Sequence, residues 1–217
     1  MIEIIAMTPE DARRIQAGGA GRIELVSALT EGGLTPSYGL IEAVTAAVDI
    51  PVNVMIRPHG KHFVYTDEEI KLMKKDIQVA RELGANGVVF GVLTPQNQID
   101  IPKLEALLAV CDGLEVTFHR AIDETDHLES IRILRSYPQI TTVLTSGGLA
   151  KPIGENLGLL KEVVSERGHI DILLGSGLNN TNFRDYQKVA GTLSCHFGTA
   201  VRDGDEITIE KVRQLTL

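Results

Sequence analysis

The chain of 217 residues contains no tryptophan, has 4% aromatic residues and carries two cysteines. With so few aromatic side chains, it has little surface on which the bases of a single-stranded nucleic acid could stack. Basic residues are also in deficit, because 21 Lys and Arg stand against 29 Asp and Glu and give a net charge of −8. An acidic surface repels phosphate backbones, so we expect no nucleic acid partner.

Long hydrophobic runs are absent as well. No apolar stretch approaches the roughly 20 residues that a membrane-spanning helix needs, and the N-terminus lacks the basic and apolar segments of a secretory signal. We therefore expect a soluble, cytoplasmic protein with no membrane partner. Cys111 and Cys195 lie far apart in the sequence, and in a reducing cytosol we expect both to be buried free thiols.

The sequence alternates between short apolar runs and stretches with helical periodicity. One such stretch, 66–83, begins with Thr66 and has Glu69 three residues later, the pattern of a capping box. Strand signals separated by helices favour a parallel sheet, and eight units close a (β/α)8 barrel. We predict a single barrel domain over 1–217, with an open doubly wound sheet as the alternative. The expected strands lie at 2–6, 22–26, 52–56, 86–92, 114–118, 140–145, 170–175 and 193–197.

Several predicted strands carry ionisable residues at positions that face the barrel interior. Alternate residues of a barrel strand point inward, and this alternation places Glu3, Glu24, Arg57 and His119 inside. A buried carboxylate needs a partner, so we expect Glu3 or Glu24 to pair with Arg57. These ions could simply satisfy one another. Arg57 and His119, however, end their strands on the C-terminal side, where barrel active sites form.

Glycine-rich loops follow three of the last predicted strands. They read TSGG at 145–148, GSG at 175–177 and HFGTA at 196–200. Glycine lets backbone amides approach an anion, and loops at this end of a barrel often bind phosphate. We therefore predict a substrate or anion site formed by Ser146, Gly147, Gly175, Ser176 and Gly177.

Five sequence blocks together resemble the CutC family. They read EGGLTPSYG at 31–39, MIRP at 55–58, GVVFGVL at 87–93, VTFHRAID at 116–123 and LTSGG at 144–148. The resemblance implies a (β/α)8 barrel, in agreement with the periodicity. It also implies a cytoplasmic protein of copper homeostasis that binds copper ion.

Copper binding, which the resemblance implies, requires suitable ligand side chains in this chain. Many family members carry cysteine near the ends of the first two strands, where this chain has Ile5 and Val26. Cu(I) prefers thiolate and thioether ligands, whereas Cu(II) accepts imidazole. The remaining donors lack diagnostic spacing, so the identity of any metal ligands stays unknown. They are Cys195, His196, Met7, Met55 and His119.

Three functions compete at this point: a copper-handling protein, an enzyme, or a non-catalytic binder of a small anionic molecule. As an enzyme, the protein would hold its substrate with Arg57 and Arg120 and use His119 as acid or base. The reaction would be abstraction of a proton beside a carbonyl or cleavage of a small phosphorylated compound. Neither turnover nor substrate follows from the fold, and a homodimer is the working hypothesis. The predicted catalytic residues are Glu3, Glu24, Arg57, His119, Arg120 and Asp123.

Overall fold

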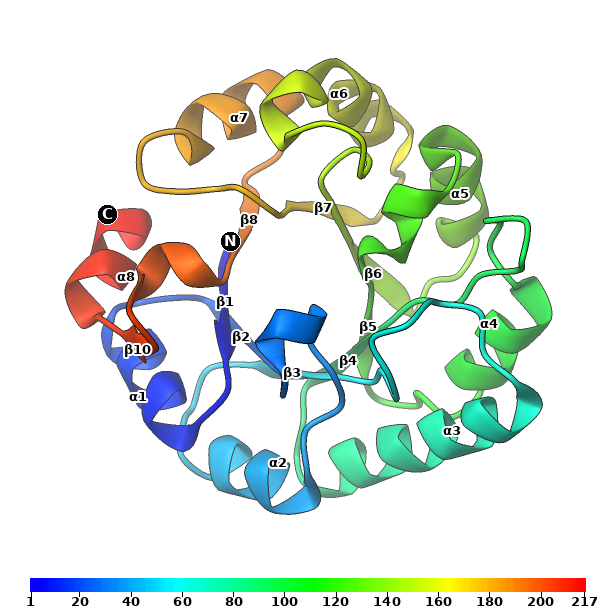
Figure 1. Ribbon diagram of the computed structural model, residues 1–217, viewed down its shortest axis with the longest axis horizontal. Coiled ribbons are helices and arrows are strands. Elements are labelled where there is room, and N and C mark those ends of the chain that lie inside the picture. The colour runs from blue at the N-terminus through cyan, green and yellow to red at the C-terminus, as the bar shows by residue number, and fades with distance from the viewer.

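Eight parallel strands close into a barrel in the computed structural model, which describes residues 1–217 (Figure 1). Each strand pairs with the next, and β1 pairs with β8 to close the ring. The predicted (β/α)8 barrel is confirmed, and every predicted apolar run contains a strand. The strands are β1 (Ile2–Ala6), β2 (Arg22–Leu25), β3 (Val52–Met55), β4 (Gly87–Phe90), β5 (Glu115–Phe118), β6 (Ile140–Thr145), β7 (Asp171–Leu174) and β8 (Ser194–Phe197).

Helices surround the barrel, as Figure 1 shows. The α-helices are α1 (Pro9–Ala17), α2 (Tyr38–Thr45), α3 (Asp67–Glu82), α4 (Ile101–Leu108), α5 (His127–Leu134), α6 (Leu157–Glu166), α7 (Phe183–Ala190) and α8 (Ile209–Thr216). The 3-10 helices are η1 (Leu29–Glu31), η2 (Arg120–Glu124), η3 (Ile153–Glu155) and η4 (Thr199–Val201), and a hairpin of β9 (Arg202–Asp203) and β10 (Glu206–Ile207) precedes α8. None of the helices combines the length and apolar character that a membrane crossing requires.

Helix α3 illustrates how local sequence sets these elements. The Thr66 side chain accepts a hydrogen bond from the Glu69 N–H, and the Glu69 carboxylate accepts one from the Thr66 N–H. This is the predicted capping box, which satisfies two N–H groups that a helix start leaves unpaired. Ile70, Met73 and Ile77 then recur on one face and are buried against the barrel.

Two separate apolar layers confirm the predicted alternation within the strands. The larger layer lies between the strands and the helices, and it contains Phe118 and both free cysteines. The smaller layer lies inside the barrel and consists of Ile5, Val26, Met55 and Val89. Because alternate strand residues point to opposite faces, side chains that break the apolar pattern on the inner face must meet inside the barrel.

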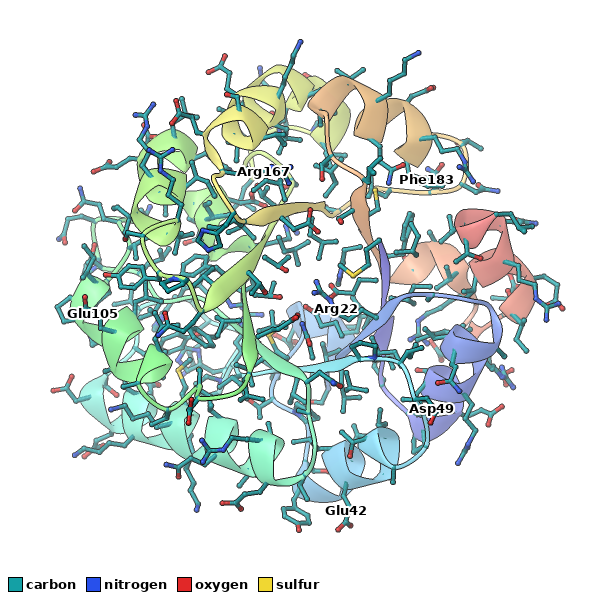
Figure 2. The ribbon with its side chains drawn as sticks, turned by 180° about the vertical axis from the view of Figure 1, so that it is seen from behind. Arg22, Glu42, Asp49, Glu105, Arg167 and Phe183 are labelled. Atoms are coloured by element: carbon teal, nitrogen blue, oxygen red, sulfur yellow. The ribbon has the colours of Figure 1, made fainter.

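The strand register brings three ionisable groups to one level of that interior. Glu3 on β1 lies opposite Arg22 on β2 and opposite His196 on β8. Figure 2 shows Arg22 inside the ring of strands, whereas Glu42 and Glu105 lie on the outer helices. The loop after β2, with η1, lies across the front of the barrel in Figure 1. The fold thus places a polar interior beneath the loops of one barrel end.

Candidate functional site

A cavity of about 580 Å³ opens at the C-terminal ends of the strands, and we call it the rim cavity. Ile5, Met55 and Leu144 give it an apolar portion. Its ionisable lining comes from four strands and the loops that follow them, and includes Glu24, Arg57, His119, Arg120 and His196. Four of the predicted catalytic residues therefore share this cavity, while Glu3 and Asp123 do not line it.

Glu3 lies in the barrel interior and is fully buried. Its Oε2 accepts a hydrogen bond from Arg22 Nε at 2.5 Å, and its Oε1 accepts one from His196 Nδ1 at 2.7 Å. Burial would raise the pKa of Glu3, but the charge of Arg22 and the contacts with His196 outweigh burial and lower this pKa. Glu3 is therefore a carboxylate whose two oxygens are both occupied by protein donors.

His196 connects Glu3 to the rim cavity. Because Nδ1 donates to Glu3, the other ring nitrogen is free, and Nε2 lies 3.8 Å from Glu24 Oε2. Burial would lower the pKa of His196, but the carboxylates of Glu24 and Glu3 outweigh burial and raise it above its usual range. His196 can therefore gain and lose a proton at Nε2 while Glu3 fixes the orientation of its ring.

Glu24 is the least satisfied carboxylate of the interior. Its side chain is buried, and its Oε1 has no hydrogen-bond partner in the protein. Burial raises the pKa of Glu24 to about 7, with the nearby charge of His196 acting in the opposite direction. Glu24 and His196 thus lie beside each other as two buried groups whose pKa values are both raised.

The predicted pairing of Arg57 with Glu3 or Glu24 is wrong. Arg57 Nη1 instead donates to the carbonyls of Glu31 at 2.7 Å and Gly33 at 3.3 Å. Arg57 follows the end of β3, so its side chain reaches the loop after β2 rather than the carboxylates within the barrel. Its buried Nε has no partner in the protein. Arg57 is therefore a cation whose Nη1 is held by two backbone carbonyls, while Nε and Nη2 donate to no group of the protein.

His119 has an environment that disfavours the predicted acid–base role. Its Nδ1 accepts the Ala121 N–H at 3.2 Å, and its ring packs on Phe63. Burial, together with the positive charge of Arg57, lowers the pKa of His119 to about 3. The ring is therefore neutral at physiological pH with its proton on Nε2, which is buried and unpaired. His119 thus lines the rim cavity as a neutral ring whose Nε2–H has no partner in the protein.

Asp123 positions Arg120. Asp123 Oδ2 accepts from Arg120 Nε at 2.9 Å, and Asp123 Oδ1 accepts from Thr145 Oγ1 at 2.5 Å. Burial would raise the pKa of Asp123, but hydrogen bonds from His127, Thr145 and Ser146 and the charge of Arg120 hold it far below its usual range. The carboxylate is saturated with donors, so it holds the Arg120 guanidinium rather than a ligand.

The five residues predicted to bind an anion divide into two groups. The Ser146 hydroxyl bonds to Asp123, the Gly147 N–H donates to Thr145 Oγ1 and the Gly175 N–H donates to the Thr145 carbonyl. These three groups are used within the protein. The other two, Ser176 and Gly177, line the rim cavity.

Two site residues are absent from the predicted catalytic set. Arg22 neutralises Glu3, and His196 figures among the sequence-based expectations only as a copper ligand. The signal for His196 is the alternation within 193–197, which places it on the same inner face as Ser194. Its contact with Glu3 depends on the closure of the barrel between β1 and β8.

One group of side chains could hold a metal ion. Glu3, Glu24 and His196 each offer a ligand atom, and these atoms lie within 4.8 Å of one another. Arg22 and His196 already occupy the oxygens of Glu3, which leaves Glu24 and the Nε2 of His196 as free donors. Burial raises the pKa of both Cys111 and Cys195 to about 12, and both lie in the outer apolar layer. The inner donors are therefore oxygen and imidazole, without a thiolate.

Substitution of Arg22 should destabilise the protein more than substitution of Arg57. Arg22→Met leaves the Glu3 carboxylate buried without its cation, and we expect the free energy of unfolding to fall by about 3–5 kcal/mol. Arg57→Met removes charged hydrogen bonds to carbonyls and leaves no buried charge behind, so we expect a loss of about 1.5–3 kcal/mol. Urea denaturation at pH 7 measures both values. Equal losses, or the reverse order, would contradict the assigned network.

Sequence relatives cover most of the chain. The model of the CutC family matches residues 1–201. The copper homeostasis protein cutC homologs of Mus musculus and Homo sapiens are each 40% identical to this chain over 198 residues, which are 90% of this chain and 72% of each relative. A family protein CutC of Bacteroides fragilis is 38% identical over 226 residues, covering 98% of this chain and 86% of the relative.

Solved structures give the same result. The crystal structure of CutC from Streptococcus agalactiae has a TM-score of 0.88 and 34% sequence identity, and it covers 93% of this chain and 99% of that one. Thiamine phosphate pyrophosphorylase from Pyrococcus furiosus has a TM-score of 0.66 at 18% identity, covers 99% of this chain and 92% of its own, and shares the fold alone. Sequence and structure agree that this chain belongs to the CutC copper homeostasis family.

Proposed function

We propose that the rim cavity binds a small anionic molecule and that the Glu24–His196 pair transfers a proton on it. The observation that carries this proposal is the position of Glu24, whose pKa is about 7, beside the imidazole of His196 in the rim cavity. The same cavity is lined by Arg57 and His119, which have nitrogens without partners in the protein. Groups whose pKa lies near the working pH are the most effective general acids and bases. Perturbed ionisable groups also gather at functional sites.

The unused donors support anion binding. Arg57 and His119 line the rim cavity, and within each side chain one buried nitrogen, Arg57 Nε and His119 Nε2, has no partner in the protein. A buried polar atom left without a hydrogen bond costs about 1–3 kcal/mol, and an acceptor oxygen of a ligand that reaches these nitrogens would recover that cost. The Arg120 guanidinium adds a second positive charge. Glu31 and Glu124 also line this cavity, so the attraction of an anion would be local to the Arg57 and Arg120 side chains.

The proposed proton transfer uses each group in one role. Glu24 in its carboxylate form takes a proton from a carbon beside a carbonyl; the electron pair of that C–H bond forms a C=C bond, and the π pair of the carbonyl moves onto its oxygen. The N–H of His119 and the guanidinium of Arg57 stabilise the resulting negative charge. His196 stabilises the Glu24 carboxylate between turnovers, and Glu3 holds His196 in place. In a hydroxyketone, return of that proton to the former carbonyl carbon, with transfer of the neighbouring hydroxyl proton to the oxyanion, would complete an isomerisation.

Deuterium exchange tests this proposal without a known substrate. We expect the protein in D2O to exchange the C–H beside the carbonyl of at least one compound in a panel of 2-oxo acids and phosphorylated hydroxyketones, followed by proton NMR. Glu24→Gln should slow this exchange by about 10²-fold or more, because it removes the base. The rate should rise with pH through about 7, where Glu24 loses its proton, rather than level off near 4.5.

Glu42→Gln is the matched control, since Glu42 is exposed on α2, outside the rim cavity. It should exchange at the wild-type rate. Exchange that is insensitive to Glu24→Gln, or no exchange with any compound of the panel, would refute the proposed chemistry.

Copper handling is the second candidate function, and the names of the curated relatives favour it. Cu(I) prefers thiolate and thioether ligands, and the thioethers of the barrel interior, Met55 and the adjacent Met7, belong to its apolar layer, with no thiol beside them on the inner face. Both thiols lie outside the barrel interior, and burial holds them in the protonated form. The inner donors, Glu24 and His196, suit harder divalent ions better.

We therefore expect the purified, reduced protein to bind Cu(I) weakly and without a stoichiometric site. Competition with a chromophoric Cu(I) chelator measures this affinity, and any residual binding should be lost in Cys111→Ser and Cys195→Ser. A tight site of one Cu(I) per chain that survives both substitutions would show that direct copper binding is the function of this protein.

A further inference from the structure

A second cavity, of about 510 Å³, lies beside the rim cavity. It is formed by the loops that follow β6 and β7. Arg120, Leu149, Ser176 and Gly177 line both cavities. A ligand in the rim cavity would therefore reach the second cavity by passing Arg120.

The ionisable lining of the second cavity is mainly positive. Arg120 and Lys151 contribute two cations, and Glu155 contributes one carboxylate. Lys151 is exposed and takes part in none of the ion pairs of the structure, whose lysine members are Lys103 and Lys211. An unpaired lysine beside an arginine favours an anionic ligand.

Arg120 is held in place before any ligand arrives. Its Nε donates to Asp123 at 2.9 Å, and its Nη2 donates to Ser146 Oγ at 3.0 Å. Its Nη1 has no partner in the protein and is left for a ligand. Because the guanidinium is already fixed, binding would cost little side-chain entropy.

The loop after β7 adds backbone donors. Ser176 and Gly177 both have left-handed φ angles, of 72° and 73°. Their N–H groups make no hydrogen bond within the protein. Successive N–H groups that are left free in such loops bind anions. A left-handed φ is uncommon for serine, and such backbone strain concentrates at functional sites.

We infer that the second cavity binds the phosphate group of a phosphate monoester. A phosphate group carries up to two negative charges and three terminal oxygens. It can therefore use the Arg120 Nη1, the Lys151 ammonium and the two free N–H groups together, whereas a carboxylate offers only two oxygens. The further conclusion that the carbonyl end of the same molecule reacts in the rim cavity rests on the proposed function; phosphate binding itself does not.

Calorimetric titration of the full chain with inorganic phosphate tests this site directly. We expect saturable binding of one phosphate per chain, weakened about tenfold or more in Lys151→Met, because a charged hydrogen bond is lost. Lys161→Met is the matched control: it removes the same charge from an exposed position on α6, outside both cavities. It should bind phosphate as the wild type does.

The absence of saturable phosphate binding would overturn the inference. An equal loss of phosphate affinity in Lys151→Met and Lys161→Met would also overturn it, because equal losses indicate a general effect of charge. Phosphate binding that depends on Lys151 in a protein without deuterium exchange would support this site and refute the proposed proton transfer. Exchange that depends on Glu24 but occurs only with compounds lacking phosphate would refute the conclusion that one molecule occupies both cavities, and would leave the proton transfer intact.

Discussion

The buried carboxylate of Glu3 is the group on which the polar interior of the barrel depends. A carboxylate cannot remain ionised in an apolar interior without compensation, and Glu3 finds it on both neighbouring strands. Arg22 supplies the charge, and His196 supplies a second hydrogen bond. Since His196 comes from β8, the arrangement exists only when the barrel closes. Closure of the fold and assembly of the site are thus the same event.

The same hydrogen bond determines what His196 can do. With Nδ1 bound to Glu3, its Nε2 is directed to the side of Glu24. Glu24 has no cation of its own, and burial raises its pKa into the range where a proton can be exchanged. The neighbouring strand ends repeat this design: Arg57, His119 and Arg120 are each fixed by contacts within the protein, and each keeps at least one nitrogen that donates to no protein group. Such preorganised donors favour a ligand that brings its own negative charge.

The fold could be predicted from the sequence because its signals are local. The eight apolar runs, the Thr66–Glu69 capping box and the alternation within strands each depend on a few adjacent residues. Alternation also places Glu3, Glu24 and Arg22 inside the barrel, but it does not give their height along the barrel axis. The pairing expected between Glu24 and Arg57 failed for this reason, since Arg57 lies beyond the end of β3 and turns to the loop after β2.

Other parts of the site depend on contacts that sequence spacing does not contain. Glu3 and His196 are 193 positions apart and meet through the barrel register. The neutral state of His119 follows from its burial and from Arg57, neither of which is visible in the motif around it. Residue types could be identified from the sequence, whereas their partners and protonation states required the structure.

If Glu3 holds His196 as a titrating group beside Glu24, nitrogen-15 NMR of the histidine rings should show it. We expect the pKa of His196 to lie above its usual value of 6.5, with a hydrogen-bonded proton on Nδ1. Glu3→Gln should lower this pKa, while His119 stays neutral in both proteins. A His196 pKa at or below 6.5 that Glu3→Gln does not change would show that Glu3 does not control this ring.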